Sequence, residues 1–416
     1  MNYQIGYGKG GQVFEIPEKN KVTYLMPNSS KGCIIGKNPV EAALSHPIGS
    51  PILESMVRAY QRIVIVTSDI TRPMPTKKVL PVLLEHLQRA GITREQITVV
   101  FALGSHRRHT EEEKRSLVGD EIYGRIRLRD SSEDEFVYMG MTPAGTPVEI
   151  AKTVAEADFR ICMGNIEYHY FAGYSGGAKA IMPGVSTRKA IQANHAKMVE
   201  RGAVVGAIDG NPVREDIEEA VKICPIDFLL NVVLNEKKEI VYAVAGHYKE
   251  AHRAGCRFLD RLYKVKIKER ADIVIASPGG YPKDLNLYQT QKALANAQFA
   301  VKDDGIIILA GSCEEGMGEK VFEEWMQEAK TPGELIRRIQ EEFRLGGHKA
   351  AAIAMVLERA AIYLVSEMDA DFVRSIFMRP YRTVQGALED ALVQKGGQRA
   401  SIIFMPYAGS MLPVIA

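Results

Sequence analysis

Cysteine is scarce in this chain: five residues among 416, and no two of them form a CxxC pair. They are Cys33, Cys162, Cys224, Cys256 and Cys313. An odd, dispersed set is typical of reduced thiols in a cytosolic protein, and its spacing argues against a structural zinc site. We therefore expect a cytoplasmic protein whose thiols are free.

The chain also lacks long apolar runs and an excess of charge of one sign. No apolar stretch reaches membrane-spanning length, and the N-terminal Met-Asn-Tyr-Gln has none of the features of a signal peptide. Lys and Arg number 53 against 51 Asp and Glu, so the charge balance favours neither nucleic acid nor a membrane as a partner. The length of an otherwise ordinary soluble protein favours two domains.

Strand and helix patterns alternate along most of the chain. Residues 62–67 and 97–103 are apolar runs typical of buried parallel strands, and residues 77–90 and 110–118 are typical of helices. Residues 1–27 have the pattern of a hairpin around a glycine turn. These patterns predict two α/β domains with mainly parallel sheets, residues 1–265 and 266–416, with the last residues packing back on the N-terminal domain.

Polar loops follow three of the predicted strands. Asp69 and Arg72 come after the first strand, His106 after the second, and His169 after the apolar run at 159–164. Open α/β sheets bind ligands at the carboxyl ends of their strands, so we expect the three loops to form one site. The alternative for each is structural: an Asx turn with a surface ion pair at Asp69 and Arg72, and a hydrogen-bonded histidine elsewhere.

The stretch HYFAGYSGGAKAIMPG, residues 169–184, is the most unusual in the sequence. Its glycine-rich turn, with Ser175, Gly176 and Gly177, is typical of a backbone that cradles phosphate. Lys179 lies among glycine and apolar residues, where loss of hydration lowers the pKa of a lysine and can make it a nucleophile or a covalent tether. The other interpretation is a solvated surface lysine.

A second polar cluster lies in the second predicted domain. A helix is expected over residues 287–300, and Gln289 and Lys292, three residues apart, share one face near its N-terminus. Because a helix N-terminus favours an anion, this face is a candidate binding surface. The alternative is a face that is simply solvated.

Several of these segments together resemble the nickel-pincer-nucleotide lactate racemase family. The similar segments, in the order of that family, are SDITRPMP (68–75), ALGSHRRHT (102–110), HYFAGYSGGAKAIMPG (169–184), NH (194–195), NLYQTQKAL (286–294) and GGHKA (346–350). The resemblance implies a racemase or epimerase that inverts C2 of a 2-hydroxy acid in a cleft between two α/β domains. It also implies dependence on the enzymes that make the nickel-pincer nucleotide, a pyridinium-3,5-bisthiocarboxylic acid mononucleotide.

The resemblance also implies a role for each candidate residue. The expected acid and base are His106 and His169, the covalent tether is Lys179, and the nickel ligand is His195. The expected cofactor contacts further include Asp69, Ser175, Gly176 and Gly177, and the expected substrate contacts are Arg72, Tyr288, Gln289 and Lys292. These roles suit the chemistry, because imidazole is a good nickel ligand and a guanidinium fork suits a carboxylate.

The sequence departs from lactate racemases at two places. Arg107, Arg108 and His109 form a more polar run than is usual there, and His348 falls near the position of a bulky aromatic residue. Both differences predict a more open or more polar pocket, and a substrate such as a sugar acid or a hydroxy-dicarboxylate instead of lactate.

Two other functions remain open from the residues themselves. One is a metal-dependent hydrolase in which Lys179 forms a Schiff base and His106, His169 and His195 hold the metal. The other is a ligand-binding protein of the same fold without catalytic activity, in which the histidines would be dispensable.

Overall fold

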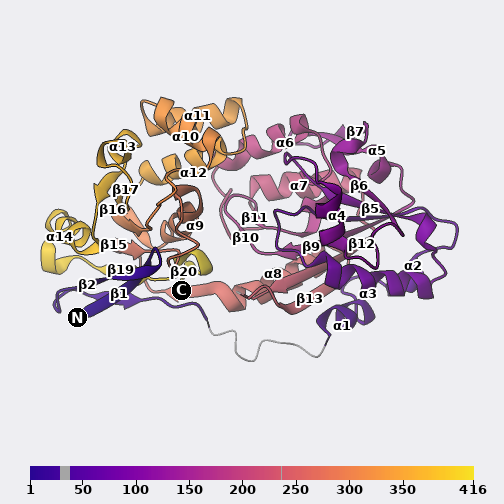
Figure 1. Ribbon diagram of the computed structural model, residues 1–416, viewed down its shortest axis with the longest axis horizontal. Coiled ribbons are helices and arrows are strands. Elements are labelled where there is room, and N and C mark those ends of the chain that lie inside the picture. Colours follow the sequence, from indigo (N-terminus) through magenta and orange to yellow (C-terminus); the bar gives the residue numbers. More distant parts are fainter. Residues whose placement is uncertain (29–37, 236) are drawn as a thin grey trace. The chain divides into compact units, whose positions relative to one another are not determined.

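The computed structural model describes residues 1–28, 38–235 and 237–416 (Figure 1). Within it the chain forms two compact units: a middle unit, Ser30–Asp260, and a terminal unit that combines Met1–Ser29 with Arg261–Ala416. The expected boundary near residue 265 lies close to this division. The first residues differ from expectation, because they belong with the C-terminal part of the chain instead of the N-terminal domain.

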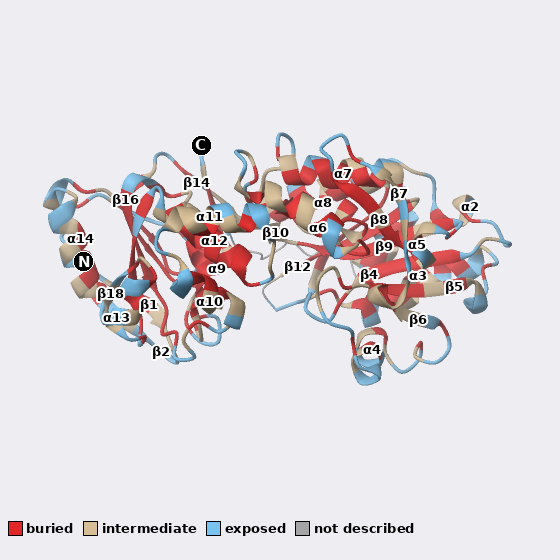
Figure 2. Ribbon diagram, turned by 90° about the horizontal axis from the view of Figure 1, so that it is seen from above, coloured by how far each residue is buried: buried red, intermediate tan, exposed pale blue. Residues whose placement is uncertain are grey.

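The middle unit is built on a sheet with the strand order β13-β12-β9-β4-β5-β6, in which only the β12–β13 pair is antiparallel. The strands are β4 (Ile63–Ser68), β5 (Ile97–Ala102), β6 (Arg127–Asp130), β9 (Phe159–Ile166), β12 (Phe228–Leu234) and β13 (Ile240–Gly246). The central strands are buried on both faces, which explains their nearly unbroken apolar sequences. Figure 2 shows them in red beneath helices with exposed outer faces.

The other elements of the middle unit cover this sheet. Its helices are α1 (Pro39–Ser45), α2 (Leu53–Met56), α3 (Thr76–Arg89), α4 (Glu111–Val118), α5 (Lys152–Ala155), α6 (Arg188–His195), α7 (Pro212–Ile223) and α8 (Tyr248–Tyr263). Two short hairpins complete it, β7 (Phe136–Met141) with β8 (Pro147–Ala151), and β10 (Tyr168–His169) with β11 (Gly173–Tyr174). A capping box of Thr110 and Glu113 begins α4.

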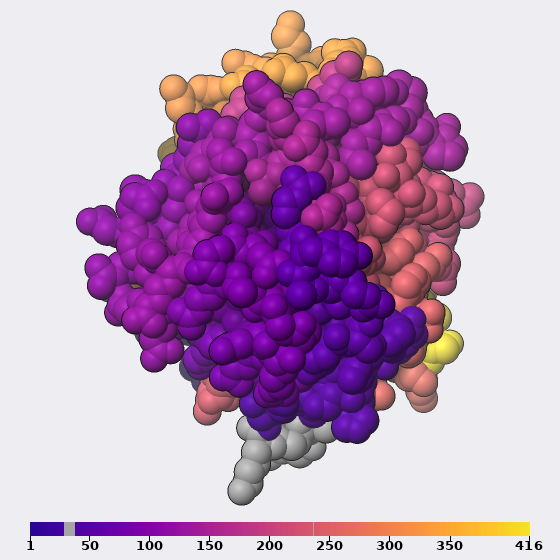
Figure 3. Space-filling view, turned by 90° about the vertical axis from the view of Figure 1, so that its right-hand side faces the viewer, coloured from indigo at the N-terminus to yellow at the C-terminus, as the bar shows by residue number. Residues whose placement is uncertain are grey.

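Segments far apart in the sequence meet on the surface of the middle unit. Ile48, which follows α1, pairs with Gly246 at the end of β13. Figure 3 shows the purple early residues of this unit side by side with its salmon-coloured segments. No helix among the described residues is both long and apolar enough to cross a membrane.

The terminal unit has a fully parallel sheet with the order β18-β17-β16-β15-β19-β3. Its strands are β3 (Val22–Tyr24), β15 (Ala271–Ala276), β16 (Val301–Ala310), β17 (Ala360–Val365), β18 (Arg379–Tyr381) and β19 (Ile402–Met405). Its helices are α9 (Leu287–Ala297), α10 (Lys320–Glu328), α11 (Pro332–Glu341), α12 (Gly347–Leu357), α13 (Ala370–Ser375) and α14 (Val384–Gln394).

Both ends of the chain are part of the terminal unit for the same reason, the burial of apolar side chains and the pairing of strands. The hairpin of β1 (Asn2–Tyr7) and β2 (Gly10–Glu15) contributes Ile5 and Phe14 to the core around Phe404. The last strand, β20 (Leu412–Ile415), pairs with β14 (Lys264–Ile267). The last residues therefore belong to the terminal unit.

The cysteines that the structure describes are buried and unpaired, in agreement with the expectation of free thiols. They are Cys162, Cys224, Cys256 and Cys313. Burial raises the pKa of the Cys256 thiol to about 12, so it is protonated and unreactive at neutral pH. Cys33 lies outside the described residues.

Candidate active site

Three neighbouring parallel strands of the middle unit bring the predicted loops to one edge of the sheet. The loop with Asp69 and Arg72 follows β4, His106 follows β5, and His169 lies in the short strand β10 that follows β9. In the sheet β4 lies between β9 and β5. The loop of Asp69 and Arg72 therefore follows the strand that is flanked by the two strands leading to His106 and His169. This edge is where open α/β sheets bind ligands.

Asp69 holds the ring of His106. The carboxylate atom Oδ2 lies 2.5 Å from Nδ1 of His106, and Oδ1 accepts a hydrogen bond from the hydroxyl of Thr71 at 2.7 Å. Burial alone would raise the pKa of Asp69, which is 3% exposed, but its bonds to His106 and Thr71 and the charges of His106 and Arg72 lower it overall. The carboxylate therefore orients the ring, and Nε2 is the atom that can exchange a proton with a ligand.

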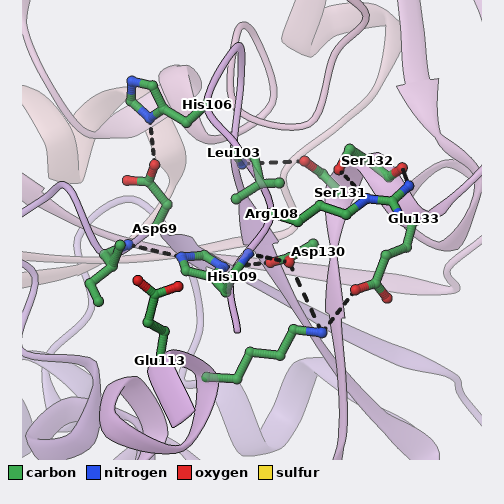
Figure 4. Close-up of polar contacts among 12 residues, drawn as sticks. Asp69, Leu103, His106, Arg108, His109, Glu113, Asp130, Ser131, Ser132 and Glu133 are labelled. Carbon is green, nitrogen blue, oxygen red and sulfur yellow. Dashed lines mark hydrogen bonds and ion pairs between the residues drawn. The ribbon is translucent and has the colours of Figure 1, made fainter. Parts of the chain in front are cut away.

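A second, buried pair connects the loop after β5 with the end of β6 (Figure 4). Nδ1 of His109 lies 2.5 Å from Oδ1 of Asp130 at the end of β6, and the His109 amide donates to Oδ2 at 2.8 Å. On the other side of the ring, Nε2 accepts a hydrogen bond from the Ile70 amide at 3.1 Å. The buried pair thus fixes the backbone next to Asp69.

Each residue of the polar run Arg107–His109 has a partner within the protein, although Arg107 and Arg108 are exposed. Arg107 forms an ion pair with Glu113 of α4 at 2.6 Å, and Arg108 donates to the Ser132 carbonyl at 2.5 Å. His109 is occupied by Asp130, as described above. These three residues therefore give no support for a larger substrate.

Lys179 and His169 lie next to each other, with 3.5 Å between Nζ and Nε2. Burial of the ammonium, together with the nearby charges of Arg214 and Arg72, lowers the pKa of Lys179 well below its usual value. Burial and the charges of Lys179 and Arg72 likewise lower the pKa of His169. Both side chains are thus favoured in their neutral, nucleophilic or basic forms.

The glycine-rich turn closes on side chains from distant strands and helices. Gly176 and Gly177 have φ of 72° and 60°, and a Cβ there would lie 2.6 Å from Asn231 Oδ1 and 2.8 Å from His252 Cγ, respectively. The Gly177 amide donates to Asn231 at 2.8 Å. The hydroxyl of Ser175 donates to a backbone carbonyl and accepts from a backbone amide. These contacts fix the shape of the turn. The Gly177 amide is used in the hydrogen bond to Asn231.

Arg214 lies beneath this turn and was not found by the sequence analysis. Its guanidinium, 0% exposed, donates to the carbonyl oxygens of Ala172 and Tyr174. Among the described residues its Nη1 atom has no hydrogen-bond partner, and burial lowers its pKa to about 10. A sequence signal existed, because Arg214 falls in register with Ile217 and Val221 on the apolar face of α7.

His195 ends α6, and Thr187 caps the beginning of this helix. The side chain is 6% exposed, its Nδ1 lies 2.9 Å from the Asn194 side-chain oxygen, and its ring packs edge-on against Phe171. Its charge is one of those that lower the pKa of His169, so the two rings are close. The structure therefore gathers His195, His169, Lys179 and Arg72 in one region of the middle unit.

The other predicted substrate contacts lie in the terminal unit. Tyr288 and Gln289 are in the first turn of α9, where Asn286 caps the helix by accepting the Gln289 amide at 3.0 Å, and Lys292 follows one turn later. His348 lies in the first turn of α12, accepts a hydrogen bond from the Gly346 amide and packs against Phe343. Its neighbour Lys349, which the sequence analysis overlooked, reaches back to Tyr288.

The histidines proposed for the hydrolase alternative do not form a metal site by themselves. Among the described residues, no group of three or more His, Cys, Asp or Glu side chains is placed to hold a metal ion.

Comparison with known proteins extends over nearly the whole chain. Residues 7–206 match the family model of the lactate racemase N-terminal domain, and residues 266–412 match that of the lactate racemase C-terminal domain. Lactate racemase of Thermoanaerobacterium thermosaccharolyticum is 34% identical over 402 residues, 94% of each chain. Lactate racemase of Lactiplantibacillus plantarum is 34% identical over 377 residues, 88% of each chain.

Solved structures give the same result. The lactate racemase apoprotein from T. thermosaccharolyticum matches with a TM-score of 0.87 and 31% identity over 100% of both chains. A protein from Thermotoga maritima shares the fold, with a TM-score of 0.64 and 16% identity over 94% of this chain and 100% of that one. With two α/β units, both family models matched and relatives above 30% identity, this chain belongs to the lactate racemase family and is a lactate racemase-like isomerase.

Proposed function

We propose that the protein inverts C2 of a 2-hydroxy acid, with His106 and His169 as acid and base and a nickel-pincer nucleotide held covalently by Lys179. The observation that carries this proposal is the order of strands in the middle unit. Arg72 follows the strand flanked by those that lead to the two histidines. A substrate anchored through its carboxylate by the guanidinium of Arg72 would have an imidazole available on each side.

The residues of the middle unit fit a covalently bound, anionic nickel cofactor. Lys179 has the lowered pKa that a nucleophilic amine needs to form an amide-type bond. The contact of His195 Nδ1 with Asn194 favours the tautomer whose Nε2 carries a lone pair, as a nickel ligand requires. The buried Nη1 of Arg214, without a partner among the described residues, suits an anion. Asp69, Ser175, Gly176 and Gly177 remain proposed cofactor contacts.

The chemistry that this group supplies when bound is a reversible acceptor for the hydride of C2. The residues of the chain itself manage the proton. His169 is neutral at pH 7 because of its lowered pKa, so it can take the proton of the C2 hydroxyl. His106 is oriented by the contact of its Nδ1 with Asp69, which leaves its Nε2 to return a proton to the oxygen. In the opposite direction the two histidines exchange roles.

The identity of the 2-hydroxy acid is a separate part of the proposal. Lactate is the substrate named for both curated relatives, and at 34% identity a larger relative of lactate is equally compatible with the family. Tyr288, Gln289 and Lys292 are proposed to contact the part of the substrate that distinguishes these acids.

The experiment uses protein produced with and without the enzymes that make the cofactor. We expect a mass increment and bound nickel only in the first preparation, and inversion of C2 when that preparation is given single enantiomers of 2-hydroxy acids. The Lys179→Ala variant should lose the mass increment and the activity together. An adduct that persists in this variant, or inversion by the cofactor-free preparation, would contradict the proposal.

A further inference from the structure

A buried carboxylate of the middle unit lies one side chain away from the proposed nickel ligand. Asp216 is on α7, and its Oδ1 accepts a hydrogen bond from the hydroxyl of Thr142 at 2.5 Å. Its Oδ2 accepts from the hydroxyl of Thr146 at 2.6 Å and from Nδ2 of Asn194 at 2.8 Å, and lies 3.4 Å from the ammonium of Lys197. The turn between β7 and β8 and the end of α6 thus meet at this carboxylate.

The partners of Asn194 decide which way its amide points. Nδ2 faces two groups that can only accept hydrogen bonds, the carboxylate of Asp216 and, at 3.2 Å, the backbone carbonyl of Val213. An amide turned the other way would place its oxygen against both acceptors. Asn194 is 0% exposed, so bulk water does not compensate for such a contact. The oxygen of the amide is therefore directed to its remaining neighbour, His195.

This orientation fixes the proton of the His195 ring. Oδ1 of Asn194 lies 2.9 Å from Nδ1 of His195, and because an amide oxygen can only accept, Nδ1 is the donor. In a neutral imidazole the other nitrogen, Nε2, then has the lone pair that a nickel ion needs. The contact also holds the ring in one orientation at the end of α6.

We propose that Asp216 is a positioning residue for the nickel ligand: by holding the amide of Asn194, it keeps the proton of His195 on Nδ1 and the lone pair on Nε2. The inference rests on the proposed function, in which His195 binds nickel. Asp216 lies outside the segments that resemble the lactate racemase family, and it acts through Asn194 instead of touching the metal. Groups that orient a metal-binding histidine in this way typically contribute about 10- to 100-fold to metal affinity.

The first measurement needs no cofactor. In cofactor-free protein with isotope-labelled histidines, nitrogen NMR at about pH 8.5, where an ordinary imidazole is neutral, distinguishes the protonated ring nitrogen from the other one. The His195→Gln variant identifies the signals of His195 by their loss. We expect protonation at Nδ1 in the wild type. In Asp216→Leu the amide of Asn194 loses its charged acceptor, so the share of rings protonated at Nε2 should rise by about 10- to 100-fold.

The second measurement is the nickel retained by the loaded enzyme in the presence of a chelator. Asp216→Leu should bind nickel about 10- to 100-fold more weakly, while the mass increment at Lys179 remains. Asp216→Asn is the conservative variant. Its amide oxygen should occupy the place of Oδ2, because Asn194, Thr146 and Lys197 all donate there. We therefore expect this variant to keep both the wild-type tautomer and the nickel.

Thr142→Val is the matched control, because it removes a hydrogen bond from Oδ1, the oxygen of Asp216 that does not face Asn194. It should lower the stability of the protein and change neither the tautomer nor nickel retention. Asp216→Ala, which adds no bulk, replaces the leucine variant if that variant does not fold.

The two proposals fail in different ways. A wild-type ring protonated at Nε2, or wild-type tautomer and nickel retention in Asp216→Leu or Asp216→Ala, would refute the role of Asp216 and leave the proposed function standing. A Thr142→Val variant that changes the tautomer as much as Asp216→Leu would also refute it, because the effect would then be structural. Nickel retained at the wild-type level by His195→Gln would contradict the proposed function itself.

Discussion

The buried pair of His109 and Asp130 allows a sharp test of how the active-site loops are held. We predict that His109→Leu destabilises the protein and loosens the contact between Asp69 and His106. The leucine removes two hydrogen bonds at once, one to the carboxylate of Asp130 and one from the amide of Ile70. In this variant the fully buried carboxylate of Asp130 still accepts the hydrogen bond from the backbone amide of residue 109. It also retains its ion pair with the ammonium of Lys114, at 4.0 Å.

The size of the effect follows from these two bonds. A buried donor left without a partner costs about 1–3 kcal/mol, and a hydrogen bond to a charged group contributes about 1.5–3 kcal/mol. His109→Leu should therefore lower the free energy of unfolding by about 3–5 kcal/mol, the range for a broken buried pair. In His109→Asn the amide takes the place of Nδ1 and keeps the bond to Asp130, so the loss should be about 1–3 kcal/mol.

Urea denaturation of the cofactor-free protein measures these free energies, and kcat of the loaded enzyme reports on the contact between Asp69 and His106. Both variants should lower kcat, because the loop beside Asp69 is no longer fixed. Arg115→Ala, which removes an exposed ion pair with Asp120 on the neighbouring helix α4, is the control and should change neither measurement. A His109→Leu variant as stable as the wild type, or an asparagine variant less stable than the leucine variant, would refute this account.

Three other outcomes are expected. Lys179→Met should stabilise the cofactor-free protein at pH 7, because folding no longer has to desolvate and deprotonate a lysine that is charged in the unfolded chain; since the folded pKa is lowered, the gain should shrink as the pH rises towards 10.5, which denaturation at pH 7 and pH 10 would show. His195→Ala should lose nickel, measured by elemental analysis, while the mass increment at Lys179 remains; nickel at the wild-type level would remove His195 as the ligand. His106→Ala and His169→Ala should each lose net inversion in both directions by roughly 10²–10⁴-fold, while releasing 2-keto acid from one enantiomer at most; full inversion by either variant would make that histidine structural.

The position of the site along the chain could be predicted because it depends on local patterns and one general rule. The apolar runs that became β4, β5 and β9 are recognisable in the sequence, and the loops after parallel strands meet at one edge. The capping residues Thr110 and Asn286 likewise act within a few residues of themselves. Such features need no knowledge of the tertiary structure.

The supporting residues could not be predicted in this way, because their partners lie far away in the sequence. Asn231 and His252 contact the glycine turn from β12 and α8, and Asp130 receives His109 from the end of β6. His109 was visible only as an unusual residue, because its partner Asp130 could not be identified from the sequence. Arg214 alone carried a local signal, a charge on the apolar face of a helix.

The joining of the two chain ends in one unit has a consequence for synthesis on the ribosome. Strand β3 pairs with β19, and Asn20 bonds to Ala400, 380 residues later. At a synthesis rate of about 5–20 residues per second, β3 is made roughly 20–75 s before its partner β19. Meanwhile the middle unit, whose residues are contiguous, can complete its sheet.

The N-terminal segment therefore leaves the ribosome before the residues that form its apolar core have been made. Ile5, Phe14 and Ile16 are each at most 2% exposed in the finished protein, and their neighbours Phe404 and Ile402 are among the last residues made. We expect a nascent chain arrested before residue 400 to show a protease-resistant middle unit and a cleavable N-terminal segment. Chaperones that hold exposed apolar segments would therefore act on this protein at its first residues, long after those residues have left the ribosome.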